Sequence, residues 1–204
     1  MSSRARAVVL LLAALALCPL AALLIGDDPA APVSRARALA EIERALGLHF
    51  ALAAHDWARR HPVVMAGAGL FYVFAHVAVA AWALVWTWCL RRDRFTVVRD
   101  VFLVTQAVTV SLYALAPTAP PRLVAGAGFS DTLSGLWGRE IADSAHLLQS
   151  PFAAMPSGHV AFALVSGGAF AAIGDRRWLR AFGWAYPPLV AAVGVRATVL
   201  LPRA

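Results

Sequence analysis

Five apolar runs, separated by arginine clusters and polar segments, constrain the fold of this chain more than any other feature of its sequence. A helix that crosses a bilayer needs roughly 20 apolar residues. Hydrophobic residues make up 61% of the chain, which is more than the core of a soluble domain uses. We therefore predict an all-α fold, a polytopic transmembrane helical bundle of about five spans. The runs are residues 8–25, 63–90, 97–116, 160–173 and 181–201.

The N-terminal part differs from the rest. Its apolar run, residues 8–25, can be a retained span or a cleaved signal peptide, and we expect a retained span because no small-x-small cleavage site is evident. Residues 27–61 contain five arginines and five acidic residues, so their net charge is close to zero. Their apolar residues recur at helical spacing. We predict an amphipathic helix on the membrane surface. Residues 1–61 then form an N-terminal unit, and residues 62–204 form the core.

The distribution of arginine predicts the topology. The formal charge is +7, but the arginines flank apolar runs, so the positive-inside rule explains them and we expect no nucleic-acid partner. With the N-terminus inside, the inner segments 1–7, 91–96 and 175–180 are each net basic, and the outer segments are nearly balanced. The long loop 117–156 then lies outside. We expect an integral protein of the plasma membrane that touches the bilayer directly.

The first candidate for chemistry is Arg122, at the end of the sequence PTAPPR that spans residues 117–122. The prolines stiffen the chain just beyond the third run. A guanidinium presents a fixed fork of donors that matches the oxygens of a phosphate. The alternative is a helix ended by proline, with an arginine that snorkels to the membrane surface.

The second candidate is the tetrapeptide Pro156-Ser157-Gly158-His159, directly before the fourth run. Proline is favoured in the first turn of a helix, and the unpaired amides and dipole at a helix N-terminus attract anions. Ser157 adds a hydroxyl, Gly158 lets an anion approach the backbone, and His159 can donate a proton to a leaving oxygen. An ordinary capped helix with an interfacial histidine is the alternative.

Together, Arg122 and the tetrapeptide resemble the first two signature motifs of the type 2 phosphatidic acid phosphatase superfamily. The resemblance covers residues 97–200. It implies that Arg122, Ser157 and Gly158 bind the phosphate of a membrane lipid phosphate and that His159 is the general acid. It also implies phosphoryl transfer through a phosphohistidine to water or an acceptor alcohol, without a metal or other cofactor.

Residues around the two motifs resemble the inositolphosphorylceramide-synthase-like (inositolphosphotransferase) branch of that superfamily. These are the double proline before Arg122, the stretch 128–132 and the stretch 153–155. The lysine that usually stands seven residues before the first motif's arginine is replaced by Leu115.

The third motif of the family, which supplies the nucleophilic histidine and an orienting aspartate, has no counterpart here. No histidine follows His159, and a sixth span, expected in an intact relative, is also missing. We therefore expect a truncated and catalytically impaired lipid-phosphate phosphatase or phosphotransferase. The alternative is a non-catalytic membrane protein or scaffold that binds phosphate headgroups.

The remaining histidines are weaker candidates. His76 lies in the middle of the second run, where a buried histidine often bonds a neighbouring helix. The other four are expected to be solvated residues of the outer face: His49, His55, His61 and His146. No spacing of metal ligands is evident, and the sequence leaves the oligomeric state open.

Overall fold

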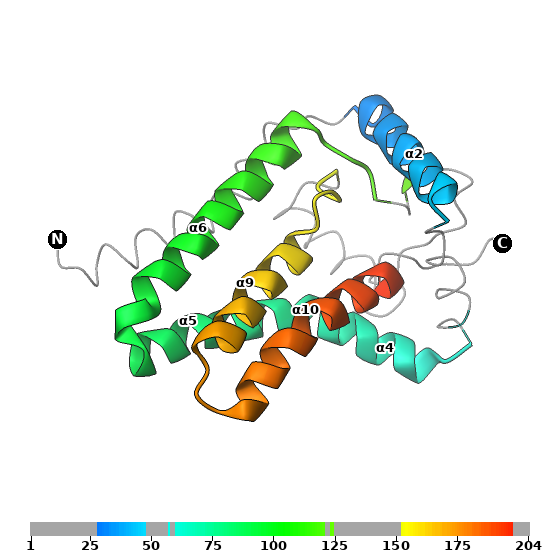
Figure 1. Ribbon diagram of the computed structural model, residues 1–204. Coiled ribbons are helices and arrows are strands. Elements are labelled where there is room, and N and C mark those ends of the chain that lie inside the picture. Colours follow the sequence, from blue (N-terminus) through cyan, green and yellow to red (C-terminus); the bar gives the residue numbers. More distant parts are fainter. Residues whose placement is uncertain (1–27, 48–56, 58–59, 121–122, 125–151, 198–204) are drawn as a thin grey trace.

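The computed structural model describes residues 28–47, 57, 60–120, 123–124 and 152–197 (Figure 1). Within these ranges the regular structure is entirely helical, which confirms the all-α class. The predicted N-terminal run lies outside them. The helices are α2 (Ala30–Ala45), α4 (Pro62–Leu70), the π-helix η1 (Phe71–Ala75), α5 (His76–Leu90), α6 (Arg92–Leu115), α9 (Gly158–Ile173) and α10 (Arg177–Ala197).

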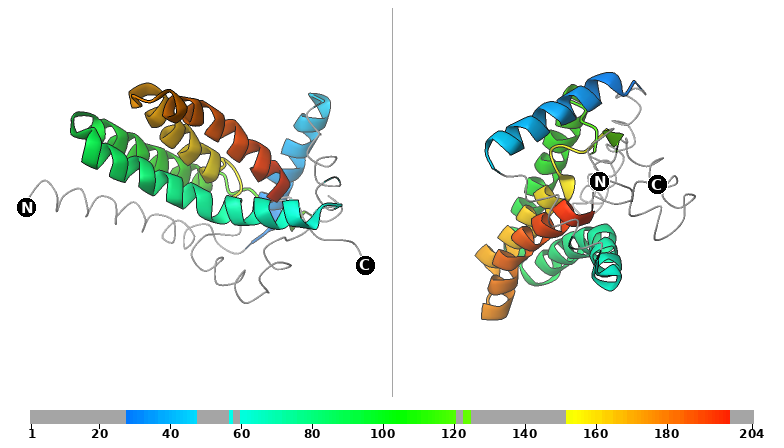
Figure 2. Two further views of the ribbon diagram at one scale, coloured as in Figure 1. Left: turned by 90° about the horizontal axis from the view of Figure 1, so that it is seen from below. Right: turned by 90° about the vertical axis from the view of Figure 1, so that its right-hand side faces the viewer.

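Helices α9 and α10 form the closest pair of the bundle (Figures 1 and 2). A Cβ atom on Gly167 would lie 2.5 Å from the carbonyl oxygen of Gly183, and a Cβ on Gly183 would lie 2.5 Å from the backbone nitrogen of Ala171. Small residues at such an interface let two helix backbones touch. The glycines therefore fix the distance between α9 and α10.

The core lies where α5, α6, α9 and α10 meet. Phe170 is fully buried at its centre, and the rings of Trp82, Trp86 and Phe182 surround it. A smaller cluster lies nearer the start of α9. The buried members of the two clusters are Ala83, Val98, Phe102, Ala169, Phe170 and Leu179, and Ala163, Tyr186 and Val190.

One described helix, α6, is long and apolar enough by itself to cross a membrane. Helices α5 and α9 are apolar but shorter. The predicted second span is helical from Pro62 to Leu90, but the π-helix η1 divides it. A bundle of about five spans therefore stays a prediction.

Two helices begin earlier than predicted. Helix α6 begins at Arg92 rather than near Val97, and α10 begins at Arg177 rather than near Ala181. Arginine is a good helix former, so the fall in hydropathy marks the end of the apolar run and not the end of the helix.

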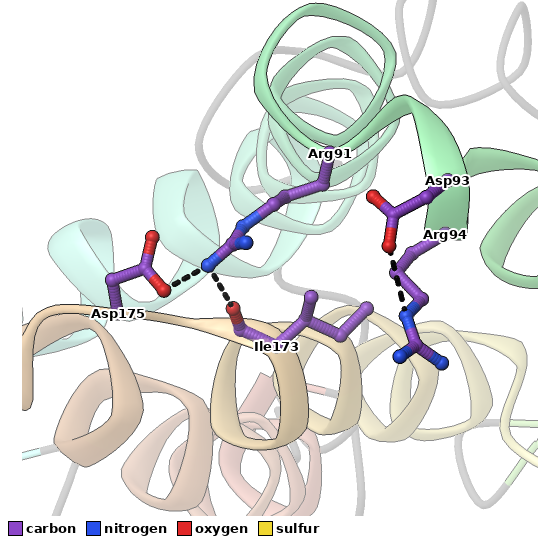
Figure 3. A network of polar contacts seen from close by, with 5 residues as sticks. All are labelled: Arg91, Asp93, Arg94, Ile173 and Asp175. Carbon is purple, nitrogen blue, oxygen red and sulfur yellow. Dashed lines mark hydrogen bonds and ion pairs between the residues drawn. The ribbon is translucent and has the colours of Figure 1, made fainter.

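One end of the bundle is held by an ion pair (Figure 3). The Arg91 side chain, between α5 and α6, pairs with Asp175 and donates a hydrogen bond of 3.2 Å to the carbonyl oxygen of Ile173. Ile173 ends α9 and Asp175 lies in the turn before α10. The contact therefore ties the α5–α6 corner to the α9–α10 turn.

Helix α2 lies at the opposite end, where α6 ends (Figures 1 and 2). The Arg35 guanidinium donates to the carbonyl oxygen of Pro117 at 3.0 Å, and the Ala119 amide donates to the carbonyl oxygen of Pro32 at 3.1 Å. Residues 30–45 of the predicted amphipathic segment are helical, and the amphipathic character of this helix stays a prediction. Its Ile42 and Leu46 side chains are exposed, and its place on a membrane surface stays a prediction.

Candidate phosphate site

The two ends of the long loop are joined by backbone hydrogen bonds. The Thr118 amide donates to the carbonyl oxygen of Phe152 at 2.8 Å, and the Ala154 amide donates to that of Thr118 at 3.2 Å. Thr118 and Ala153 thus form an isolated parallel bridge. Because Thr118 precedes Arg122 by four residues, the chain that carries the first motif starts beside the chain that leads into the second. Arg122 itself lies outside the described residues.

Ser157 begins α9 as the sequence predicted. Its extended backbone and its side-chain oxygen, which accepts a hydrogen bond from the Val160 amide at 3.4 Å, make it the N-cap. Its carbonyl oxygen accepts from the Ala161 amide at 3.0 Å. The cap satisfies one of the donors that a helix start leaves unpaired. The hydroxyl hydrogen is not used by this cap, so a phosphate contact by Ser157 stays a prediction compatible with the geometry.

Gly158 is in close contact with α6. Its amide donates to the hydroxyl oxygen of Tyr113 at 3.2 Å, and a Cβ atom on Gly158 would lie 3.0 Å from that oxygen and 3.9 Å from Cγ2 of Thr109. The glycine therefore lets the start of α9 approach the buried polar side of α6. Tyr113, Thr109 and Gln106 are all buried.

The sequence analysis missed the part that Tyr113 plays in the site. The signal was present, because residues 106, 109 and 113 recur at spacings of three and four, although the same run has other polar residues at positions 99, 100, 105 and 111. That spacing predicts a polar face on α6. It does not reveal that this face meets Gly158, since the contact joins residues 45 positions apart.

The imidazole of His159 is held between two rings from the second run. It stacks on Tyr72, with ring centroids 3.9 Å apart and planes 15° apart, and it touches His76 with centroids 4.0 Å apart. Nδ1 of His76 lies 3.2 Å from the carbonyl oxygen of Tyr72. A carbonyl can only accept, so this nitrogen carries the proton of the bond. The His76 ring thus contacts α9 through His159, while its hydrogen bond to Tyr72 stays within its own run, and a bond from His76 to a neighbouring helix stays a prediction.

These contacts place an acid–base group beside a helix N-terminus. The start of α9 supplies amides and the positive end of the dipole, which favour an anion. His159 is the second residue of the same helix. Within the described ranges, no three His, Cys, Asp or Glu side chains gather as a metal site would require.

The comparison with protein families gives the class. A family model described as the PAP2 superfamily matches residues 37–198, which is most of the chain. The chain belongs to the PAP2 superfamily, the type 2 phosphatidic acid phosphatases that the motifs resemble. Comparisons with curated proteins and with solved structures found no match. Membership of the inositolphosphorylceramide-synthase-like branch stays a prediction.

Proposed function

We propose that this chain is an integral membrane lipid-phosphate phosphatase or phosphotransferase with its site at the start of α9. The observation that carries the proposal is the position of Ser157, Gly158 and His159 in a PAP2 superfamily member. The three residues open α9 beside the paired ends of the loop that carries Arg122. An anion-attracting helix end and a proton donor are thus adjacent in the chain.

The proposed chemistry is transfer of a phosphoryl group. Arg122, the Ser157 hydroxyl and the first amides of α9 bind the phosphate oxygens and neutralise their charge. The bond between phosphorus and the lipid oxygen breaks, and the leaving oxygen takes a proton from His159. Phosphorus gains a bond to the oxygen of water or of an acceptor alcohol, which releases its proton to bulk water, and His159 takes up a proton from bulk water before the next turnover. If a phosphohistidine forms on the way, as in the family, its nucleophile is not assigned to any of these 204 residues.

A membrane setting is supported by the surface of the bundle. Large apolar side chains are exposed on several helices, including Val85 on α5, Val104 on α6 and Trp184 on α10. A patch of this kind is costly in water and ordinary against lipid tails. We therefore propose a polytopic bundle in the plasma membrane, with the N-terminus inside and the site on the outer face, where a lipid phosphate can reach it from the leaflet.

The test is phosphate release from phosphatidic acid by the purified chain in detergent micelles. We expect release that is slow, because no nucleophilic histidine is assigned, and we expect His159→Asn to lower it further by roughly 100-fold or more, as loss of a general acid does. His61→Asn is the matched control, because His61 is exposed and its hydrogen bond among the described residues is a local one, to the carbonyl oxygen of Trp57.

The assay separates turnover from binding. Release that His159→Asn abolishes and His61→Asn leaves intact supports the proposed function. A chain that binds orthovanadate but releases no phosphate overturns the enzymatic proposal in favour of a phosphate-binding protein. Release that is indifferent to His159→Asn refutes the assigned acid. Adding an alcohol and measuring its phosphorylated product then distinguishes transfer from hydrolysis.

A further inference from the structure

The π-helix η1 lies where two rings, those of Tyr72 and His76, contact the same side chain, His159. Tyr72 lies within η1 and His76 directly follows it, four residues later, so both lie on one side of the helix. Their rings contact the His159 imidazole at 3.9 and 4.0 Å. A π-turn inside an α-helix is rare and occurs often at functional sites. Its place next to the proposed acid therefore calls for a physical explanation.

Helix α10 supports the π-turn from behind. The buried Tyr186 hydroxyl donates a hydrogen bond of 3.3 Å to the carbonyl oxygen of Ala75, the last residue of η1. A Cβ atom on Gly194 would lie 3.2 Å from Cε2 of Tyr72, so the Tyr72 ring lies close to the α10 backbone. Tyr72 is thus enclosed between α10 and the His159 ring, which limits the rotation of both rings.

The contact distances exclude one role for His76 in this arrangement. In-line transfer between two histidines requires the phosphoryl group to lie between the attacking nitrogen and the acid, with reacting atoms about 3–3.5 Å apart. Rings with centroids 4.0 Å apart leave no such space. His76 therefore touches the acid without being placed to attack a phosphate that the acid protonates.

We propose that Tyr72 and His76 are positioning residues that clamp the His159 imidazole for proton donation to the leaving oxygen. This inference rests on the proposed function. Stacking on Tyr72 fixes the plane of the His159 imidazole, and the tilted contact with His76, at an interplanar angle of 54°, limits its rotation within that plane. The hydrogen bond from Nδ1 of His76 to the Tyr72 carbonyl keeps the two clamping residues in register.

The clamp predicts an effect that depends on the leaving group. An alkoxide leaving from a lipid phosphate needs the proton, whereas p-nitrophenolate is stable without it. We expect Tyr72→Leu and His76→Leu to lower kcat for phosphatidic acid by roughly 10- to 100-fold, since misplacement of a catalytic group by about 1 Å can cost that much. The same variants should change kcat for p-nitrophenyl phosphate by less than about 3-fold, and KM for either substrate by as little.

Matched variants separate positioning from damage to the fold. Tyr72→Phe keeps the stacked ring and should retain kcat. Val77→Leu places a leucine next to His76 but at an exposed position, and it should behave as wild type. A structural defect would lower kcat for both substrates together.

NMR of histidine labelled in its ring tests the contact independently of turnover. The stacked Tyr72 ring should shift the His159 resonance upfield by its ring current, and Tyr72→Leu should remove that shift while Val77→Leu keeps it. A wild-type chain with the shift but without turnover on either substrate overturns the proposed function, and the positioning role with it. If the wild-type chain is active, but Tyr72→Leu and His76→Leu lower kcat equally for both substrates or for neither, the positioning role is overturned and the proposed function is not.

Discussion

The two ends of the bundle use polar residues in different ways. The arginine-rich end, defined here as residues 91–100 and 175–180, contains seven arginines and three aspartates. Its ion pairs are largely on the surface, and two of the three join sequence neighbours. At the site end, residues 117–120 and 152–159, the contacts are backbone hydrogen bonds, a capped helix and stacked rings.

Under the proposed function, the difference follows from the role of each end. A charge that orients a helix in a membrane needs only to lie on the correct side of the bilayer, and exact partners matter little. A group that transfers a proton must be held within a fraction of an ångström of its target. Substitutions at the arginine-rich end should therefore act on topology or slightly on stability, and substitutions at the site end should act on turnover.

The largest expected effect is on topology, and it is all or none. In a chain with Cys18→Ala and Cys89→Ala, a cysteine at Ser130 should react in intact cells with a reagent that cannot cross the membrane, and a cysteine at Asp93 should not. The reason is the excess of arginine on the Asp93 side. Labelling at Asp93 with protection at Ser130 would place the site on the inner face.

Gly158→Ala should lower turnover on phosphatidic acid by about 10-fold, which corresponds to about 1.4 kcal/mol in the barrier. The added methyl group would lie 3.0 Å from the Tyr113 hydroxyl and would push the start of α9 from α6. Gly168→Ala is the control, because a Cβ atom there meets nothing within 4 Å. Equal turnover in the two variants would show that the contact with α6 does not position the site.

Asp175→Asn should have the smallest effect. It removes the ion pair with Arg91, but the Asp175 side chain is 77% exposed, and exposed pairs contribute at most about 1 kcal/mol. We expect a loss of that size or less in the free energy of unfolding in detergent, and unchanged turnover. A loss of turnover would mean that the arginine-rich end is coupled to the site.

The sequence predicted the helical class and the start of α9, because apolar runs and capping residues are local signals. It misplaced the start of α6, where Arg92 and Arg94 continue the helix beyond the apolar run. It could not predict η1, since a single π-turn leaves no trace in an evenly apolar run such as 63–90. The ring contacts of His159 could not be predicted either, because Tyr72 and His76 meet it through the packing of η1 and α5 against α9.

We expect the first motif and the arginine-rich end to differ in the effect that removing a single arginine has on anion affinity. Arg122→Gln removes a charge from the first motif, and Arg94→Gln removes the same charge from the arginine-rich end, where Arg94 is exposed and, among the described residues, forms an ion pair with its neighbour Asp93. The readout is the Kd of the purified chain for orthovanadate, a phosphate-shaped anion, by titration calorimetry.

We expect Arg122→Gln to weaken orthovanadate binding by about 10- to 100-fold, the contribution of a charge-assisted hydrogen bond of about 1.5–3 kcal/mol, and Arg94→Gln to leave it unchanged. Equal affinity in wild type and Arg122→Gln, or equal weakening by both variants, would contradict a phosphate site at the start of α9 that includes Arg122.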